Sequence, residues 1–176
     1  MRGLRYINDP TEVILRVALD TELSGEWAAA VGLFLLANEP TNAAILLSSE
    51  ISEALRAQNQ ERTVELVEVA EEFKRVQRGC NLSEFSTLSL LVDLSVLFDR
   101  CSREDAEQAF HISKSLRLIP TEPESVSVIV SEFHMVPQKV REVLPDACHN
   151  LMKCLVDSCI RSSVTGRTSP LSSCEN

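Results

Sequence analysis

A run of leucine, valine and phenylalanine between residues 85 and 98 constrains the fold more than any other stretch. Three of its polar residues, Ser86, Ser89 and Asp93, recur at helical spacing, so they form one narrow stripe along a helix. A helix that is apolar on all its other sides packs against several neighbours at once. We therefore expect a buried central helix over residues 82–100, with Leu94 among its most buried side chains.

Residues 102–120 predict a second helix, which pairs with the central one as an αα-hairpin. Ser102 fits an N-cap, with Asp105 at the third helical position as a variant of the capping box. Pro120 is expected to close this helix. Its expected inward face is made of Ala106, Ala109, Phe110, Ser113 and Leu116.

The composition favours an all-α fold. The chain of 176 residues is long enough for one domain with a sizeable core, and it holds only five glycines and one tyrosine. Helical patterns recur with short gaps, and we expect helices over residues 9–22, 26–38, 41–58, 60–78, 82–100, 102–120, 125–133 and 137–161. No fixed repeat length is visible. The predicted architecture is an irregular α-solenoid segment of about eight helices stacked as antiparallel hairpins, over residues 9–161.

Several local features carry separate expectations. Residues 1–8 lack periodicity and should fray, and residues 162–176 are rich in Ser, Thr, Gly and Pro and should form a disordered tail. Residues 125–133 alternate valine with serine as a strand does, but a lone strand in a helical chain has no pairing partner, so a helix is favoured. Pro145 should kink or restart the last helix. Four helices have expected inward faces, made of Val13, Ile14, Val17 and Ala18; of Ala44, Leu47, Ile51, Ala54 and Leu55; of Val126, Ile129, Val130 and Phe133; and of Val140, Val143, Leu144, Ala147, Leu151, Leu155 and Cys159.

Charge and hydropathy exclude some partners. A net charge of −9 argues against direct nucleic-acid binding and against docking on anionic lipid, since both need clustered Lys and Arg. The longest apolar run, residues 27–37, is too short to span a bilayer, so no transmembrane segment is expected. No signal-peptide pattern precedes the first helix, which favours a cytosolic or nuclear location.

No pattern of catalytic, cofactor-binding or metal-ligating residues stands out. His111, His134 and His149 are isolated, and Asp93 is the one acidic residue inside the apolar run. Dinucleotide, phosphate-loop and zinc-protease motifs are missing, so neither an enzyme nor a small-molecule site is predicted. Cys148, Cys154 and Cys159 are too widely spaced for a typical zinc pair, and we expect reduced thiols that fill the core.

The order and spacing of several apolar segments resemble a known family. Residues 86–99 (STLSLLVDLSVLFD), 109–112 (AFHI), 116–120 (LRLIP) and 124–126 (ESV), preceded by 25–37 (GEWAAAVGLFLLA), are similar to the C-terminal part of the Nic family of scaffold nucleoporins. That family includes the ninety-three-kilodalton inner-ring component of the nuclear pore complex. The resemblance covers residues 25–159, and the chain departs from the family pattern at Pro145 and in its serine-rich tail.

The resemblance implies a structural role. It implies a coat-related α-solenoid, corresponding to the last third of the family's chain, that supports nucleocytoplasmic transport of protein and mRNA at the nuclear envelope through protein–protein contacts. Implied partners are other inner-ring nucleoporins and a membrane-linked adaptor nucleoporin. The alternative hypothesis is a free-standing helical adaptor or coat-type repeat protein that binds linear peptides in a groove.

Overall fold

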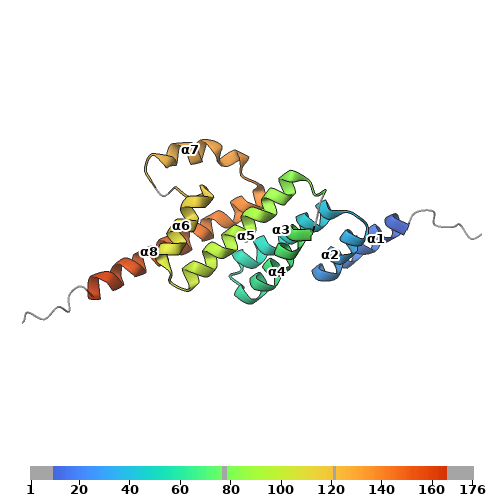
Figure 1. The fold of residues 1–176 in the computed structure, drawn as a ribbon, viewed down its shortest axis with the longest axis horizontal. Helices are drawn as coiled ribbons and strands as arrows, with labels where there is room; N and C mark the ends of the chain where they lie inside the picture. Colours follow the sequence, from blue (N-terminus) through green and yellow to red (C-terminus); the bar gives the residue numbers. More distant parts are fainter. Residues whose placement is uncertain (1–9, 77–78, 121, 166–176) are drawn as a thin grey trace, which may run out of the picture. The chain divides into compact units, whose positions relative to one another are not determined.

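A computed structural model describes residues 10–76, 79–120 and 122–165, and this part of the chain is all helical (Figure 1). Eight α-helices and one 3-10 helix follow one another in the described residues, with no strand among them. The all-α prediction is therefore confirmed. The elements are α1 (Pro10–Leu23), α2 (Trp27–Leu36), α3 (Pro40–Arg56), α4 (Gln60–Val76), α5 (Leu82–Ser102), α6 (Ala106–Leu116), α7 (Ser125–Glu132), η1 (Phe133–Met135) and α8 (Gln138–Thr165).

The chain divides into two compact units. Unit 1 contains the described residues up to 92 together with residues 137–142, so it holds α1 to α4. Unit 2 contains the described residues of 93–136 and those from 143 onward, so it holds α6, α7 and η1. Helices α5 and α8 each contribute residues to both units.

Four three-residue turns share one backbone geometry. Their middle residues are in the left-handed region, with φ of 81° at Gly25, 59° at Asn38, 52° at Gln58 and 59° at Glu104. In each turn the N–H of the third residue donates to the carbonyl five residues earlier, at N···O distances of 2.9–3.2 Å. These are Schellman turns, which satisfy helix C-terminal carbonyls. The backbone geometry of the four turns therefore repeats although their sequences differ. They read Ser-Gly-Glu, Ala-Asn-Glu, Ala-Gln-Asn and Arg-Glu-Asp.

The fourth turn corrects the predicted cap of α6. Ser102 is the last residue of α5 and donates its hydroxyl to the Phe98 carbonyl at 2.9 Å. Asp105 is the N-cap instead, accepting the Gln108 N–H at 3.2 Å. The capping-box prediction was wrong because the turn consumes residues 103–105 before the next helix can begin. Helix α6 also ends earlier than Pro120, at Leu116, since the next residue takes a left-handed conformation.

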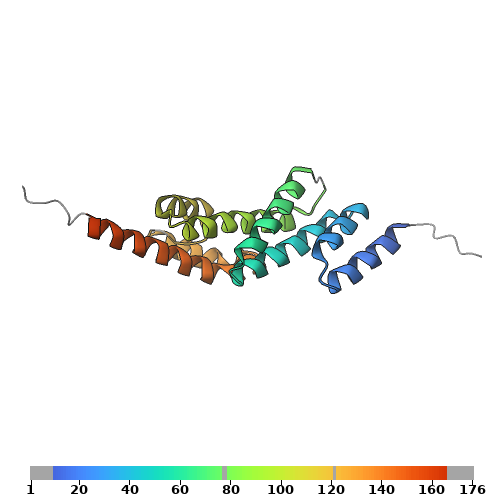
Figure 2. The ribbon, with the colours of Figure 1, turned by 90° about the horizontal axis from the view of Figure 1, so that it is seen from below.

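Helix α3 forms the centre of unit 1. It packs against α2 and against α4 (Figure 2). More than half of its 17 residues are buried. The predicted inward face is confirmed in full, with Ala44, Leu47, Ile51, Ala54 and Leu55 all buried. Each fully buried Leu or Ile contributes about 1.5–3 kcal/mol relative to an exposed one.

Polar contacts add specific ties within unit 1. Ser52 on α3 donates its hydroxyl to the Lys139 carbonyl at 3.2 Å, which joins residues 137–142 to the central helix. The Asn81 N–H donates to the Thr41 hydroxyl at 3.1 Å, and Arg62 pairs with Glu50 between α4 and α3. The apolar core is therefore supplemented by contacts that fix the register of neighbouring segments.

The central helix α5 has the predicted sidedness. Leu94 is fully buried, while Ser86 and Asp93 are exposed on the polar stripe. The buried positions Thr87, Leu88, Leu91, Val92, Leu94, Ser95 and Leu97 cover more than half of the helix circumference at 3.6 residues per turn. Because its side chain is exposed, Asp93 is not a buried charge.

Two predicted inward faces are wrong. In α1, Val13 and Val17 are exposed and only Ala18 is buried, because α2 covers the adjacent side of the helix. Residues 125–132 are helical as predicted, but α7 buries none of its residues. Helical periodicity marks an apolar face without showing that a neighbour covers it.

Helix α8 differs from its prediction at its C-terminal end. It continues through Pro145 as one helix, which excludes a restart there, and it runs to Thr165, so residues 162–165 are helical and do not belong to the expected tail. Its buried positions Val140, Val143, Leu144, Ala147, Leu151 and Cys154 leave Cys159 outside the stripe, where it is exposed. The expected frayed residues 1–8 and the rest of the tail lie outside the described residues.

Candidate interaction surface

The residues that could have carried chemistry are dispersed. His111, His134 and His149 are exposed on three different elements, and His134 Nδ1 lies 2.9 Å from the Ser131 carbonyl. Within the described part of the chain, no three His, Cys, Asp or Glu side chains lie close enough together to hold a metal ion. The same part contains no helix that is both long and apolar enough to cross a membrane.

Two cysteine thiols of unit 2, those of Cys101 and Cys154, are shielded from solvent and lie next to each other. Cys154 is buried, and its thiol is hydrogen-bonded to that of Cys101. Burial, followed by the neighbouring Cys154, raises the pKa of Cys101 to about 12, and burial also raises the pKa of Cys154. A thiol must lose its proton to act as a nucleophile or a metal ligand, so both groups are inert at neutral pH.

Exposed apolar side chains gather on α7 and η1. Val126, Val130 and Phe133 follow the i, i+4, i+7 spacing of one helix face, and Met135 follows in η1. All four are exposed, Val130 at 69% and Met135 at 75%. We call Val126, Val130, Phe133 and Met135 the α7 face. Val126, Val130 and Phe133 belong to the face that the sequence pattern marked as inward, whose fourth residue, Ile129, is partly buried. No residue of α7 is fully buried.

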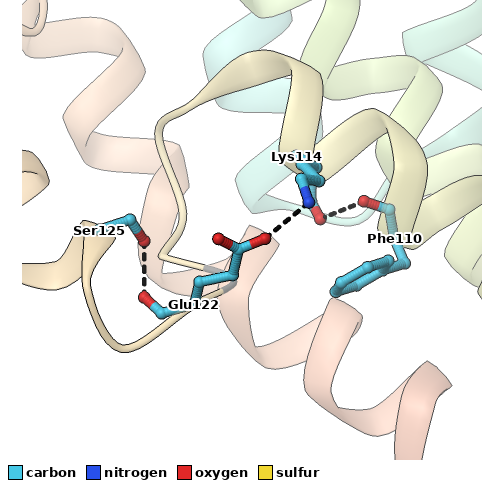
Figure 3. Close-up of polar contacts among 5 residues, drawn as sticks. Phe110, Lys114, Glu122 and Ser125 are labelled. Carbon is cyan, nitrogen blue, oxygen red and sulfur yellow. Dashed lines mark hydrogen bonds and ion pairs between the residues drawn. The ribbon is translucent and has the colours of Figure 1, made fainter.

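Short polar contacts fix the connection from α6 to α7 (Figure 3). The Lys114 ammonium pairs with the Glu122 carboxylate at 2.6 Å, and the Ser125 hydroxyl donates to the Glu122 carbonyl at 2.7 Å. The hydrogen bond and charge of Lys114 hold the pKa of Glu122 below its ordinary value. Phe110 lies one helical turn before Lys114 on α6, and its ring is partly exposed (Figure 3).

The segment around α7 is acidic. Residues 118–136 contain Glu122, Glu124 and Glu132 but neither Lys nor Arg. Glu122 is neutralised by Lys114, whereas Glu124 and Glu132 form no ion pair with another described residue. Glu132 also lies at the C-terminal end of α7, where the helix dipole is already negative and the last turn holds no basic residue.

Sequence reasoning identified α7 as a helix but missed its surface. The one sequence feature that indicated an exposed helix was its serine content. Ser125, Ser127 and Ser131 lie among valines, so α7 has no clear polar side. An apolar face that runs over α7 and η1 gives no information about which neighbour covers it.

The fold defines the class of the protein as an all-α chain of consecutively packed helices. Comparison with known sequences identifies the family. Residues 6–172 match the Nup93/Nic96 family, and the chain belongs to it. The resemblance stated from the sequence alone is therefore confirmed.

Three curated relatives are named as nuclear pore complex proteins. The chain is 29% identical over 160 residues to the nuclear pore complex protein Nup93 of Xenopus tropicalis and 29% identical over 160 residues to that of Xenopus laevis. It is 26% identical over 158 residues to the protein of the same name from Danio rerio. Each match covers 86% of this chain and 18% of the relative. The chain thus spans about a fifth of the length of these relatives.

Proposed function

We propose that this chain is a structural scaffold segment of the nuclear pore complex, located at the nuclear envelope and acting without catalysis. The observation that carries the proposal is the match to the Nup93/Nic96 family over residues 6–172. The stack of hairpins supports it, since a solenoid presents long surfaces for protein contact.

The proposed partners are other inner-ring nucleoporins, with a membrane-linked adaptor nucleoporin as one of them. Through these contacts the segment supports pore assembly and the transport of protein and mRNA. Support for these partners comes from the family resemblance and from the names of the relatives, which are nuclear pore complex proteins.

The test is proximity labelling in cells that express the tagged full chain. Enrichment of inner-ring nucleoporins, together with a rim of signal at the nuclear envelope, supports the proposal. A chain with a disrupted core, Leu47→Asp, is the matched control, because it removes the fold but keeps the tag and the length. Diffuse signal without nucleoporin enrichment contradicts the proposal.

A second candidate is a free-standing helical adaptor that binds linear peptides. The exposed α7 face favours it, since an apolar helix face can pair with a peptide helix. Recovery of one unrelated set of proteins, with no nucleoporins, supports the adaptor over the scaffold.

A further inference from the structure

The C-terminal half of α8 carries apolar side chains on its solvent side. Met152, Val156 and Ile160 follow i, i+4, i+8 spacing and are 67%, 54% and 57% exposed. At about 100° per residue they lie on the side of α8 opposite to the buried Leu151 and Cys154. We call Met152, Val156 and Ile160 the α8 stripe. Single exposed apolar side chains are ordinary, but a row on one helix face is a surface on which a second helix can pack.

Two opposite charges lie along one edge of the α8 stripe. Lys153 is exposed beside the stripe, and the half-buried Asp157 follows one turn later on the same flank. Neither forms an ion pair with another described residue, whereas Arg161, one turn further on, pairs with Glu104. Within one helix, Lys four residues before an acidic residue is the less favourable order. Both charges are therefore available to another chain.

The order of these charges indicates what that chain is. A uniformly basic helix would be repelled by Lys153, and a uniformly acidic one by Asp157. A second copy of α8 in antiparallel orientation presents the reverse order, so that each Lys153 meets Asp157 of the other copy. The flank of the α8 stripe is therefore complementary to itself.

One register satisfies both the charges and the stripe. In a two-fold symmetric interface, if residue i contacts residue j of the other copy, then j also contacts i. Pairing Lys153 with Asp157 places the two-fold axis at residue 155, halfway between them. Pairing Met152 with Val156 places it at residue 154, which is only about 1.5 Å away along the helix. The same axis thus covers the apolar side chains and pairs the charges twice.

We propose that the α8 stripe is a self-association surface, on which two copies of the chain pack α8 against α8 in antiparallel orientation. Lys153 and Asp157 set the register, and Met152 and Val156 supply the apolar contact. The contact is short, so the dimer belongs to the class of weak, reversible interfaces. This inference goes beyond the proposed function, which concerns contacts with other nucleoporins, and it does not depend on it.

The test measures the sedimentation coefficient of the full chain from about 1 to about 300 µM, a range suited to a weak dimer. We expect a rise from monomer to dimer that added salt weakens. Lys153→Glu and Asp157→Lys should each weaken the dimer at least about tenfold, because each places like charges opposite one another at both symmetric positions. Mixing the two variants should restore association, since in the mixed pair the introduced charges face each other and the native charges face each other.

Matched variants locate the surface. Val156→Lys should weaken the dimer at least about tenfold, while Val128→Lys on α7, at a position 53% exposed, should change it by less than about twofold. Val130→Lys tests the α7 face in the same way and should also have little effect. Circular dichroism of every variant should match that of the native chain, because the substituted side chains do not belong to the core.

Several results would overturn the proposal. A chain that stays monomeric throughout the range has no self-association surface. Equal losses in Val156→Lys and Val128→Lys would show non-specific association, and loss in Val130→Lys alone would show that the α7 face joins the copies. Failure of the mixed charge variants to associate would exclude the antiparallel register. A monomer that enriches nucleoporins refutes only this inference, whereas a dimer without nucleoporin enrichment refutes only the proposed function.

Discussion

Helices α3 and α7 show how one kind of sequence pattern leads to two different outcomes. Both carry apolar residues at helical spacing interrupted by serines. In α3 the apolar face is covered by α2 and α4, and Ser52 bonds to a carbonyl from a distant segment. In α7 the apolar face is exposed, and Ser125 and Ser131 bond only to carbonyls three residues earlier. The comparison separates a helix that organises its unit from one that is available to a partner.

The largest expected effect tests the burial of α3. Leu47→Ala should lower the free energy of unfolding by about 2–5 kcal/mol, because it removes a fully buried side chain and leaves a cavity. Val130→Ala, the matched change on α7, should stay within about 0.5 kcal/mol. Urea denaturation followed by circular dichroism measures both values. Similar losses for the two variants would mean that α7 is packed as firmly as α3.

The second effect concerns local opening. Amides of α7 should exchange with solvent deuterium through local opening, because no buried side chain holds the helix in place. Amides in the middle of α3, around Leu47 and Ile51, should exchange only with cooperative unfolding of their unit. Hydrogen exchange with mass spectrometry on the full chain resolves the two peptides. Equal protection in α3 and α7 would contradict the comparison.

A smaller effect tests the turns that align the helices on either side of α3. Gln58 is exposed and takes a left-handed conformation that glycine adopts without steric cost. Gln58→Gly should therefore raise the stability by up to about 1 kcal/mol. The control is Glu53→Gly on the exposed side of α3, which should lower the stability by about 1 kcal/mol. Destabilisation by Gln58→Gly would show that its side chain matters more than its backbone.

The smallest effect concerns the connection to α7. The pKa of Glu122 is lowered by Lys114, so the stabilisation from this pair is present above the ordinary carboxyl pKa and is lost as the pH falls through the lowered value. In Lys114→Gln the pKa of Glu122 should rise toward its ordinary value. Carboxyl ¹³C chemical shifts followed through an acid titration report this pKa directly. An unchanged pKa in the variant would mean that Lys114 does not pair with Glu122 in solution.

The sequence was sufficient to predict the helices and much of the core. The faces of α3 and the sidedness of α5 followed from periodicity, because both helices are covered by neighbours of the same chain. The exposed faces of α1 and α7 did not follow, since apolar spacing is the same whether the covering helix belongs to this chain or to another one. The candidate surface could be located only after the structure showed which face was left open.

The turns were beyond sequence reasoning for a different reason. Ser102 and Asp105 are both good cap residues three positions apart, and only the left-handed conformation of Glu104 decides between them. Glutamate and glutamine, unlike glycine, rarely adopt the left-handed conformation, so their presence in the sequence does not predict it. Backbone hydrogen bonds to the preceding helix fix it instead.

The four Schellman turns also limit how the chain can change in length. Each turn has one left-handed residue and one cap residue, so every residue of the turn has a fixed place in its hydrogen-bonding pattern. Inserting or deleting a residue would turn the following helix by about 100° about its axis and move its apolar face away from its neighbour. Substitutions in these turns should therefore be tolerated far better than insertions or deletions. The chain is 26–29% identical to its relatives, and the turns predict that such divergence occurs by substitution, with the spacing between the helices kept.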